Sequence, residues 1–420
     1  MNRRSFLGTL PLSAAAVKLA AAEAAGARPE STPGKSDRPA LPPGVNYFTR
    51  KKLESLVDTS LSLKDIPFQA VAFNFPNYHP SPTQEKYFGK GWTEWELLER
   101  AKPMFEGHLQ PKRCLWGAFN EADPAWAERE IETASSYGIS GFAVDWYWYD
   151  GIQVLQEQLE QGFLKARNRN KMRFAIMWAN ISWRNQYPPP DSASGYNDCP
   201  AIYEQTYSDA DMDHITEYWI EHYFREPNYL RIEDQPLVQI FDVLGILKFF
   251  GVEKLRATFD RMRNRVARAG LKGLHLQACL VYIPGVTPLK AAGFDSATHY
   301  HTFRLRTPGK TSDFAANAES AIALWKETAA KLEVPYYPDC PTGWDDSPRY
   351  TTHSHIVIHG SPDQYELFLE AAKYFVAEHK TKPPLIFLSS WNEWSEDHCL
   401  LPDTVHGYGY LEAVGRQFAR

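Results

Sequence analysis

Cysteine is scarce in this sequence, and its spacing does not match a metal site. Five cysteines occur in 420 residues, and none belongs to a Cys-x-x-Cys pair. Structural zinc sites take their ligands at short, regular spacings, so we expect no metal and no cofactor. One disulfide remains open as an alternative, and the spacing does not identify its partners. The cysteines are Cys114, Cys199, Cys279, Cys340 and Cys399.

Long apolar runs, clusters of positive charge and a phosphate-binding loop are also missing. Beyond the amino-terminal segment no stretch reaches the roughly 18 apolar residues that span a bilayer, so we expect no stable membrane insertion. The net charge is −6, the pI is near 6.1, and no run of Lys and Arg alternates with aromatic residues. Nucleic acid is therefore not expected as a partner. No glycine-rich loop follows the first expected strand, which argues against a dinucleotide-binding fold.

The amino terminus carries the pattern of an export signal. Arg3 and Arg4 precede an alanine-rich apolar segment at residues 10–22, and Ala25-Gly26-Ala27 offers a small-x-small cleavage site. The pattern resembles a signal for the twin-arginine translocation machinery. We expect residues 1–27 to be a signal peptide and residues 28–65 to be a Pro-rich tether and lead-in, with the mature protein periplasmic or secreted. An uncleaved signal anchor is the alternative.

Short apolar strands alternate with amphipathic helices along residues 66–420. About eight such pairs predict a single-domain α/β protein, a (β/α)8 TIM-type barrel with long loops at its C-terminal face. An open doubly wound sheet is the alternative. We expect strands at residues 68–75, 141–151, 173–180, 236–242, 274–281, 296–300 and 334–339 and from 385 onward, with helices at 123–137, 153–167, 209–223, 253–269, 288–292, 314–332 and 363–379 and from 408 onward.

Aromatic residues make up 14% of the chain, which is high for a plain scaffold. Many of them stand with Asp, Asn and His near the expected carboxyl ends of the strands, where a barrel of this class carries its active site. Such side chains stack on sugar rings and hydrogen-bond sugar hydroxyls. The expected substrate-binding residues are Tyr78, His79, Trp92, Glu94, Trp95, Asp145, Trp146, Trp148, Asn180, Trp344, Asp345, Trp391, Asn392 and Trp394.

The segment at residues 385–397 holds the candidate catalytic residues. A short apolar run breaks into small polar residues, two tryptophans and the carboxylates Glu393 and Glu396. Residues three apart are neighbours in a helical turn, with Cβ atoms roughly 5–6 Å apart. Paired carboxyl groups about 5–5.5 Å apart suit a retaining glycosidase. A polar turn with two solvated glutamates is the alternative.

Several motifs occur in the order typical of one family. The chain resembles the glycoside hydrolase family 99-like (WbsX-like) domains, which are distantly similar to endo-α-mannosidases. The resemblance spans nearly all of the mature chain, and its most specific motif is Trp-Asn-Glu-Trp-x-Glu. The motifs lie at residues 78–80, 91–95, 102–108, 141–151, 178–180, 343–345, 391–396 and 407–412.

The resemblance implies a catalytic pair and a route. Glu393 would act as base toward the substrate's own 2-hydroxyl, giving a 1,2-anhydro sugar, while Glu396, with a raised pKa, would protonate the leaving oxygen. Glu393 would have to stay ionised. Ser395 replaces the His of the endo-mannosidases and Asp397 replaces the usual Gly, so the polymer and linkage are not predicted. A glycosyltransferase or polysaccharide-assembly enzyme and a non-catalytic carbohydrate-binding protein are the alternatives.

Overall fold

The computed structural model describes residues 44–187, 196–281, 288–303, 310–350 and 354–419. The expected signal peptide and residues 28–43 of the expected tether and lead-in lie outside these ranges. Residues Leu41–Arg420 form one compact unit. Within the described ranges no helix is both long and apolar enough to cross a membrane. All five cysteines are buried free thiols.

Nine parallel strands form a nearly closed barrel, which confirms the predicted fold class. Their order around the barrel is β12-β10-β9-β8-β4-β2-β1-β15-β13. The consecutive strands β12 and β13 are two halves of one barrel strand separated by Pro338, whose carbonyl accepts a hydrogen bond of 2.9 Å from the N–H of Phe387. The strands are β1 Gln69–Asn74, β2 Ile139–Tyr149, β4 Arg173–Trp178, β8 Gln235–Ile240, β9 His275–Leu280, β10 Ser296–His299, β12 Tyr336–Tyr337, β13 Asp339–Pro341 and β15 Leu385–Ser389.

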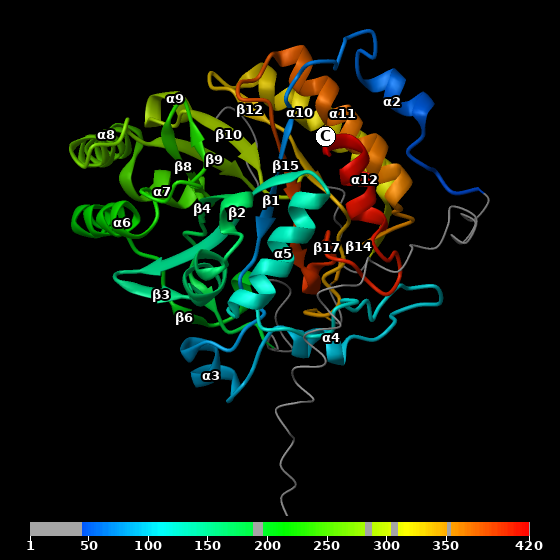
Figure 1. Ribbon diagram of the computed structural model, residues 1–420, viewed down its shortest axis with the longest axis horizontal. Helices are drawn as coiled ribbons and strands as arrows, with labels where there is room; N and C mark the ends of the chain where they lie inside the picture. The colour runs from blue at the N-terminus through cyan, green and yellow to red at the C-terminus, as the bar shows by residue number, and fades with distance from the viewer. Residues whose placement is uncertain (1–43, 188–195, 282–287, 304–309, 351–353, 420) are drawn as a thin grey trace, which may run out of the picture. The chain divides into compact units, whose positions relative to one another are not determined.

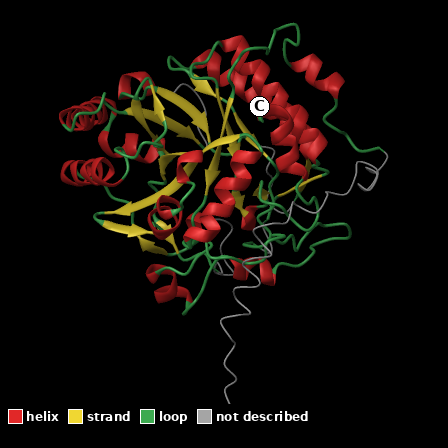
Figure 2. Cartoon of the chain, viewed as in Figure 1, coloured by secondary structure: helices red, strands yellow, loops and turns green. Residues whose placement is uncertain are grey.

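Helices cover the outside of the strands, as Figures 1 and 2 show. Local sequence sets their starts: the Asp123 carboxylate accepts from the N–H of Ala125 at 2.9 Å, and Pro124 occupies the first helical position. Serines cap α6 and α11 in the same way. The covering helices are α5 Pro124–Ser136, α6 Asp209–His222, α7 Val243–Phe250, α8 Val252–Arg268, α9 Leu289–Ala292, α10 Phe314–Lys331, α11 Pro362–His379 and α12 Gly409–Phe418.

The helix expected at residues 153–167 begins later than predicted. Strand β2 continues beyond the barrel and turns back into β3 (Ile152–Val154), with Tyr149 opposite Ile152. Asp150 and Gly151 both have positive φ, 47° and 88°, as a two-residue hairpin turn requires. Only then follow a π-helical turn at Gln158–Gly162 and a 3₁₀ turn at Phe163–Lys165. Asp-Gly is a hairpin signal, so the sequence did contain this information.

Part of the expected lead-in is folded. Helix α2 (Arg50–Leu56) packs against α10 and α11. The N–H of the buried Phe48 donates to Gln364 of α11 at 2.7 Å, and Arg50 makes two hydrogen bonds, 2.6 and 2.7 Å long, to Glu370. The part of the lead-in from residue 44 therefore belongs to the folded unit.

Short elements build the loops beyond the carboxyl ends of the strands. Helix α3 (Pro82–Phe88) and helix α4 (Trp95–Arg100) lie toward the lower edge of the molecule in Figure 1. Three two-stranded sheets are β5 Trp183–Arg184 with β6 Ala201–Tyr203, β11 Thr311–Asp313 with β14 Ile356–Ile358, and β16 Asn392–Glu393 with β17 His398–Cys399. Strand β7 (Arg231–Ile232) pairs with the barrel strand β8. Further 3₁₀ turns occur at Arg169–Lys171, Tyr196–Asp198 and Trp394–Glu396. Apart from β7 and the turn Arg169–Lys171, which lie at the amino ends of β8 and β4, these segments surround the candidate site.

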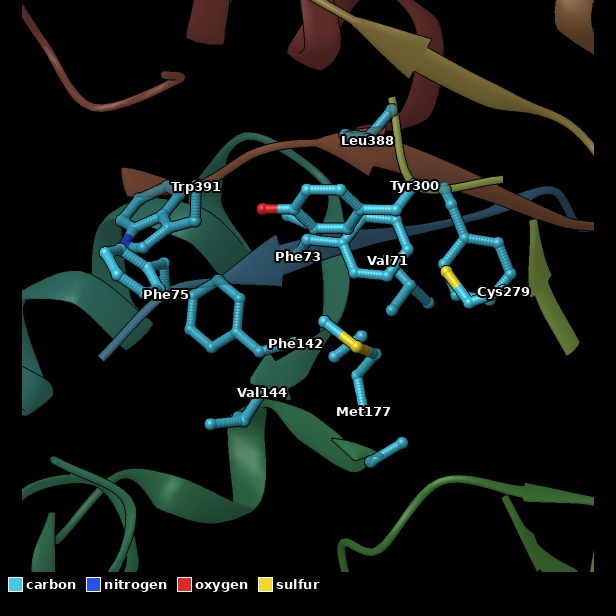
Figure 3. Packing of buried hydrophobic residues seen from close by; sticks show 14 of the residues in the cluster. Val71, Phe73, Phe75, Phe142, Val144, Met177, Cys279, Tyr300, Leu388 and Trp391 are labelled. Atoms are coloured by element: carbon cyan, nitrogen blue, oxygen red, sulfur yellow. The ribbon is translucent and has the colours of Figure 1, made fainter. Parts of the chain in front are cut away.

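Aromatic, aliphatic and sulfur-containing side chains fill much of the barrel interior, beside a buried pair of amides, Gln239 and Gln277, and the upper layer reaches the candidate site. Figure 3 shows Tyr300 lying alongside Phe73 and Val71, with Cys279 and Met177 close by. The rings of Tyr300 and Phe73 meet edge to face with centroids 4.8 Å apart. Tyr300 is therefore both a core residue and, through its hydroxyl, a neighbour of the polar groups described next.

Candidate active site

A cavity of about 1310 Å³ lies at the carboxyl ends of the strands. Glu393 and Glu396 both lie on its wall. Aromatic side chains from several loops share the wall, among them Tyr147, Tyr187 and Tyr300. A deep aromatic cavity with a few convergent polar groups is the usual form of a small-molecule or glycan site.

The loop after β15 positions the two glutamates. Glu393 ends strand β16 and pairs with His398 of β17, and its N–H donates to the Ser390 hydroxyl at 2.9 Å. A 3₁₀ turn follows at once and places Glu396 on the same side. One carboxylate oxygen of each glutamate and one ring nitrogen of His398 lie within 4.8 Å of one another. The expected juxtaposition of the two carboxyl groups is therefore present.

A buried guanidinium joins three carboxylates. Arg349 lies 2.7 Å from Glu94 and 3.2 Å from Glu393, and its other terminal nitrogen contacts Glu396. Glu94 is completely buried, and it also accepts hydrogen bonds from Ser395 and from an amide side chain. Arg349 was not identified from the sequence. A divalent cation bound by Glu393 and Glu396 would be repelled by the guanidinium of Arg349. We therefore infer that Arg349 balances the negative charge of the two glutamates.

Burial raises the pKa of Glu393 well above its usual range. The guanidinium of Arg349 opposes this shift, and the neighbouring carboxylates Glu396, Glu94 and Asp145 add to it. The Tyr300 hydroxyl donates to Glu393 at 3.3 Å. The family resemblance implies an ionised Glu393. Burial opposes ionisation of this carboxyl, and the family pattern does not reveal that burial. Asn392 does not contact Glu393, because its side chain bonds the backbone of Phe75 instead.

Glu396 is less enclosed than Glu393. Its side chain is 15% exposed, and His398 Nε2 lies 3.0 Å from its second oxygen. The His398 ring stacks on Trp344, with centroids 5.4 Å apart and planes 12° from parallel. His398 was also missed from the sequence, and the only available signal was its position two residues after Glu396.

The cavity wall includes three of the expected substrate-binding residues. These are Asp145 from the end of β2, Asn180 beyond β4, and Trp344 from the loop after β13. The Asn180 amide donates to the Tyr207 hydroxyl at 2.8 Å and also to the Asp242 carbonyl. This fixes the orientation of Asn180 on the wall.

Strand alternation places the aromatic residues of β2 on opposite faces. Asp145 and Tyr147 line the cavity, whereas Trp146 and Trp148 face α6. Trp146 donates its indole N–H to the Tyr223 hydroxyl at 3.1 Å, and Trp148 donates to Asp211 at 2.7 Å. These two tryptophans are not brought to the cavity wall, because successive residues of a strand point to opposite sides.

The remaining expected residues form a buried layer behind the wall. The Tyr78 hydroxyl accepts from the N–H of Trp394 at 3.0 Å, and the indole of Trp391 donates to Glu130 at 2.8 Å. Trp95 packs against Tyr78 with ring centroids 4.6 Å apart and planes tilted by 51°. This layer holds the loop of the two glutamates from below.

Trp92 and Asp345 also lie behind the wall. Trp92 packs against the wall residue Tyr187, with centroids 5.1 Å apart. Asp345 lies 2.7 Å from His108, and its carboxylate accepts from the N–H of Ser347. Burial raises the pKa of Asp345, but these hydrogen bonds outweigh it, so the net shift is downward.

His79 is a buried cation in this layer. Burial lowers its pKa, but Glu121 at 3.2 Å and Glu157 at 3.3 Å together raise it to about 9. Glu121 also accepts from the backbone of Tyr78 and from Asn392. His79 is therefore placed to support the loop and does not reach the cavity wall.

Similarity to known proteins gives the fold and the family. Two structures of known proteins show the fold: a glycoside hydrolase-like protein (TM-score 0.58, 13% identity, 87% of this chain and 98% of that one) and the family 99 endo-α-mannosidase of Bacteroides thetaiotaomicron (TM-score 0.50, 15% identity, 83% and 96%). The uncharacterized protein WxcX of Xanthomonas campestris pv. campestris is 28% identical over 373 residues, which cover 84% of this chain. The chain spans about half the length of that relative. The model of the family described as glycosyltransferase WbsX matches residues 70–414, and the chain therefore belongs to the WbsX family, as a domain like those of glycoside hydrolase family 99.

Proposed function

We propose that the protein is a retaining glycoside hydrolase that cleaves a polysaccharide or another glycan with Glu393 and Glu396. The observation that carries this proposal is the pair itself: two carboxyl groups on one cavity wall, with oxygens within 4.8 Å of each other, share one buried guanidinium. Close carboxyl pairs suit retention of configuration.

The proposed route uses each glutamate once as acid and once as base. Glu393 takes the proton of the sugar's 2-hydroxyl as that oxygen attacks C1, and Glu396 gives its proton to the leaving oxygen. The product of this step is a 1,2-anhydro sugar. Water then attacks C1, Glu396 takes its proton, and Glu393 returns a proton to the 2-oxygen. Both carboxyl groups regain their starting states.

Arg349 supports this route by its position. Its contact with Glu393 favours the ionised base against the effect of burial. Arg349 contacts one carboxylate oxygen of Glu396, and His398 contacts the other. The guanidinium thus links the two groups whose charges must change in opposite directions during the reaction.

The cavity volume of about 1310 Å³ favours a substrate of several sugar units. Beyond Tyr300 the wall continues through Phe241 to Leu244 and Phe249 of α7. Phe249 is 54% exposed, and its ring packs on that of Tyr207 with centroids 5.3 Å apart. An exposed aromatic ring at a cavity wall suits stacking on a sugar face. We propose that this end of the cavity holds units of the glycan distant from the cleaved bond.

A glycosyltransferase is the second candidate, because the family model carries that description. With Asp145 and the proposed acid Glu396 protonated, the described wall bears three carboxylates, Asp242, Asp346 and Glu393, against three cations, Arg184, Lys248 and Arg349, so it has no excess of positive charge. Arg349 is already shared among carboxylates. A nucleoside diphosphate would add negative charge to this wall, whereas a neutral glycan would not. The wall therefore favours hydrolysis over transfer from a sugar nucleotide.

Export is part of the proposal and rests on Arg3 and Arg4 before the apolar segment. We propose that residues 1–27 direct the protein through the twin-arginine translocation machinery to the periplasm or beyond. Mass spectrometry of the exported protein should show a new amino terminus near Arg28. An intact Met1 on the exported form would contradict this proposal.

Incubation of residues 28–420 with a polysaccharide panel, followed by NMR of the products, tests the activity. We expect cleavage with retained anomeric configuration, and its loss in Glu393→Gln. Inversion would contradict the retaining route. Transfer that occurs only when a sugar nucleotide is added would favour the second candidate, and binding of a polysaccharide without cleavage would favour a non-catalytic carbohydrate-binding protein.

A further inference from the structure

Asp145 is a wall residue whose charge has no evident partner. It lies on the inward side of β2, lines the cavity, and is 6% exposed. Its Oδ1 atom is buried and makes no hydrogen bond to any residue in the described part of the chain. Leaving a buried carboxylate oxygen without a hydrogen bond is costly, so this atom disfavours the ionised form, while the accessible part of the side chain faces the cavity.

Among the described residues, the titratable groups that interact with Asp145 offer no positive charge. Those that interact with it electrostatically are Glu396 and Glu393 from the loop after β15, Tyr147 from β2, Cys279 from β9 and Tyr300 beyond β10. Two of these are acids, and the other three are neutral in their protonated forms. An ionised Asp145 would therefore be buried beside two further carboxyl groups without compensation.

We propose that Asp145 is held as a neutral carboxylic acid and that its O–H donates a hydrogen bond to a hydroxyl of the sugar unit seated beside Glu396. The inference rests on the proposed glycosidase function for the identity of the ligand, but not for the protonation state. Burial and the charge of Glu396 both raise the pKa of Asp145 well above its usual range, in agreement with the geometry.

A neutral acid at this place has a consequence for specificity. It offers one donor and one acceptor to a single hydroxyl, whereas a carboxylate only accepts. A sugar that lacks this hydroxyl would leave the buried acid unpaired, and sites of this kind reject such analogues strongly. Asp145 is therefore a specificity-determining residue for one hydroxyl of the substrate and not a third acid or base of the reaction.

Stability against pH tests the protonation state without a substrate. A carboxyl whose pKa is higher in the folded than in the unfolded protein has no effect below the unfolded value, about 3.9, and destabilises the fold increasingly as the pH rises above it. The melting temperature of Asp145→Asn relative to wild type should therefore rise from pH 5 to pH 8. Asp145→Ser removes the same titrating group and should show the same trend if the Asn variant folds poorly.

Asp58→Asn is a control of opposite sign. Hydrogen bonds from Ser60 lower the pKa of the exposed Asp58, so its removal should become less favourable, or stay without effect, as the pH rises. A melting-temperature difference for the Asp145 variants that is flat, or falls with pH, would overturn the proposal. The melting-temperature test needs no substrate, so it gives an answer even if the protein cleaves no glycan. Failure of the proposed protonation state can therefore be distinguished from failure of the proposed glycosidase function.

Kinetics on the polysaccharide cleaved in the panel test the donor role. Asp145→Ala should lower kcat/KM at least about tenfold, and Asp145→Asn should recover part of this loss, because an amide N–H also donates to a hydroxyl. If Asn is as poor as Ala while stability shows the expected pH trend, a carboxyl proton or charge takes part in the reaction and the specificity role is wrong.

Discussion

Replacing Arg349 with methionine tests the reasoning about the site most directly. The change removes the one guanidinium that contacts Glu94, Glu393 and Glu396, and it keeps a side chain that fills much of the space. Arg349 is 8% exposed, and Glu94 and Glu393 are buried with it. The variant would therefore leave negative charges in the interior without a counter-charge.

The expected loss of stability is large. Removing one partner of a buried ion pair destabilises a protein by about 3–5 kcal/mol, because the remaining charge stays desolvated. The carboxyl groups can reduce this loss by taking up protons, which is easier at low pH. The destabilisation of Arg349→Met should therefore be greater at pH 8 than at pH 5. Arg349→Lys keeps the charge but not the fork that reaches three carboxylates, so its loss should be intermediate.

Chemical unfolding at both pH values, followed by circular dichroism, measures these changes. Arg167→Met is a matched control, since Arg167 also pairs with a glutamate, Glu128, but its side chain is 88% exposed. An exposed ion pair contributes little. Two results would contradict this reasoning: an Arg349→Met variant that is no less stable than Arg167→Met, or a loss of unfolding free energy in Arg349→Met that does not grow from pH 5 to pH 8. Either would show that Arg349 does not compensate the charge of the buried carboxylates.

The same variant should change the pH dependence of activity. Burial already raises the pKa of Glu393, and without Arg349 that pKa should rise further. Because the proposed base must be ionised, the acid side of the kcat/KM profile should move to higher pH. An acid limb that stays in place would show that Glu393 is not the group whose ionisation limits the reaction.

Two further predictions concern the cavity. Glu393→Gln and Glu396→Gln should each lower turnover by roughly 10²–10⁴-fold, and steady-state kinetics should show that only Glu396→Gln keeps activity on activated aryl glycosides, whose leaving groups need no proton. Near wild-type turnover in either variant would remove that residue from the mechanism. Phe249→Ala should raise KM for a polysaccharide and leave an aryl monoglycoside unaffected, because the exposed ring lies far along the wall; Val405→Ala, also exposed but outside the cavity wall, is the control. Equal effects of both substitutions on KM would contradict a role for Phe249 in holding distant sugar units.

The barrel and the glutamate pair were accessible from the sequence because both are local patterns. Apolar runs of strand length recur between helices, and Glu393 and Glu396 need only one turn to become neighbours. The orientation of Asp145 to Trp148 was not accessible in the same way. Both faces of β2 are buried, so polar and apolar residues do not alternate in this stretch. The sequence pattern therefore does not indicate which residues point into the barrel and which point toward the helices.

Arg349 shows why the electrostatics of the site could not be predicted. It lies in an irregular loop after β13, and its partners Glu94, Glu393 and Glu396 come from two distant segments of the chain. The sequence does show three glutamates in motifs expected to form one site, and carboxylates that become buried there require a compensating cation. That requirement predicts that such a cation exists, but 45 lysines and arginines are available to meet it. Only the packing of the loop selects Arg349, and with it the attraction that favours the ionised form of Glu393 on which the proposed reaction depends.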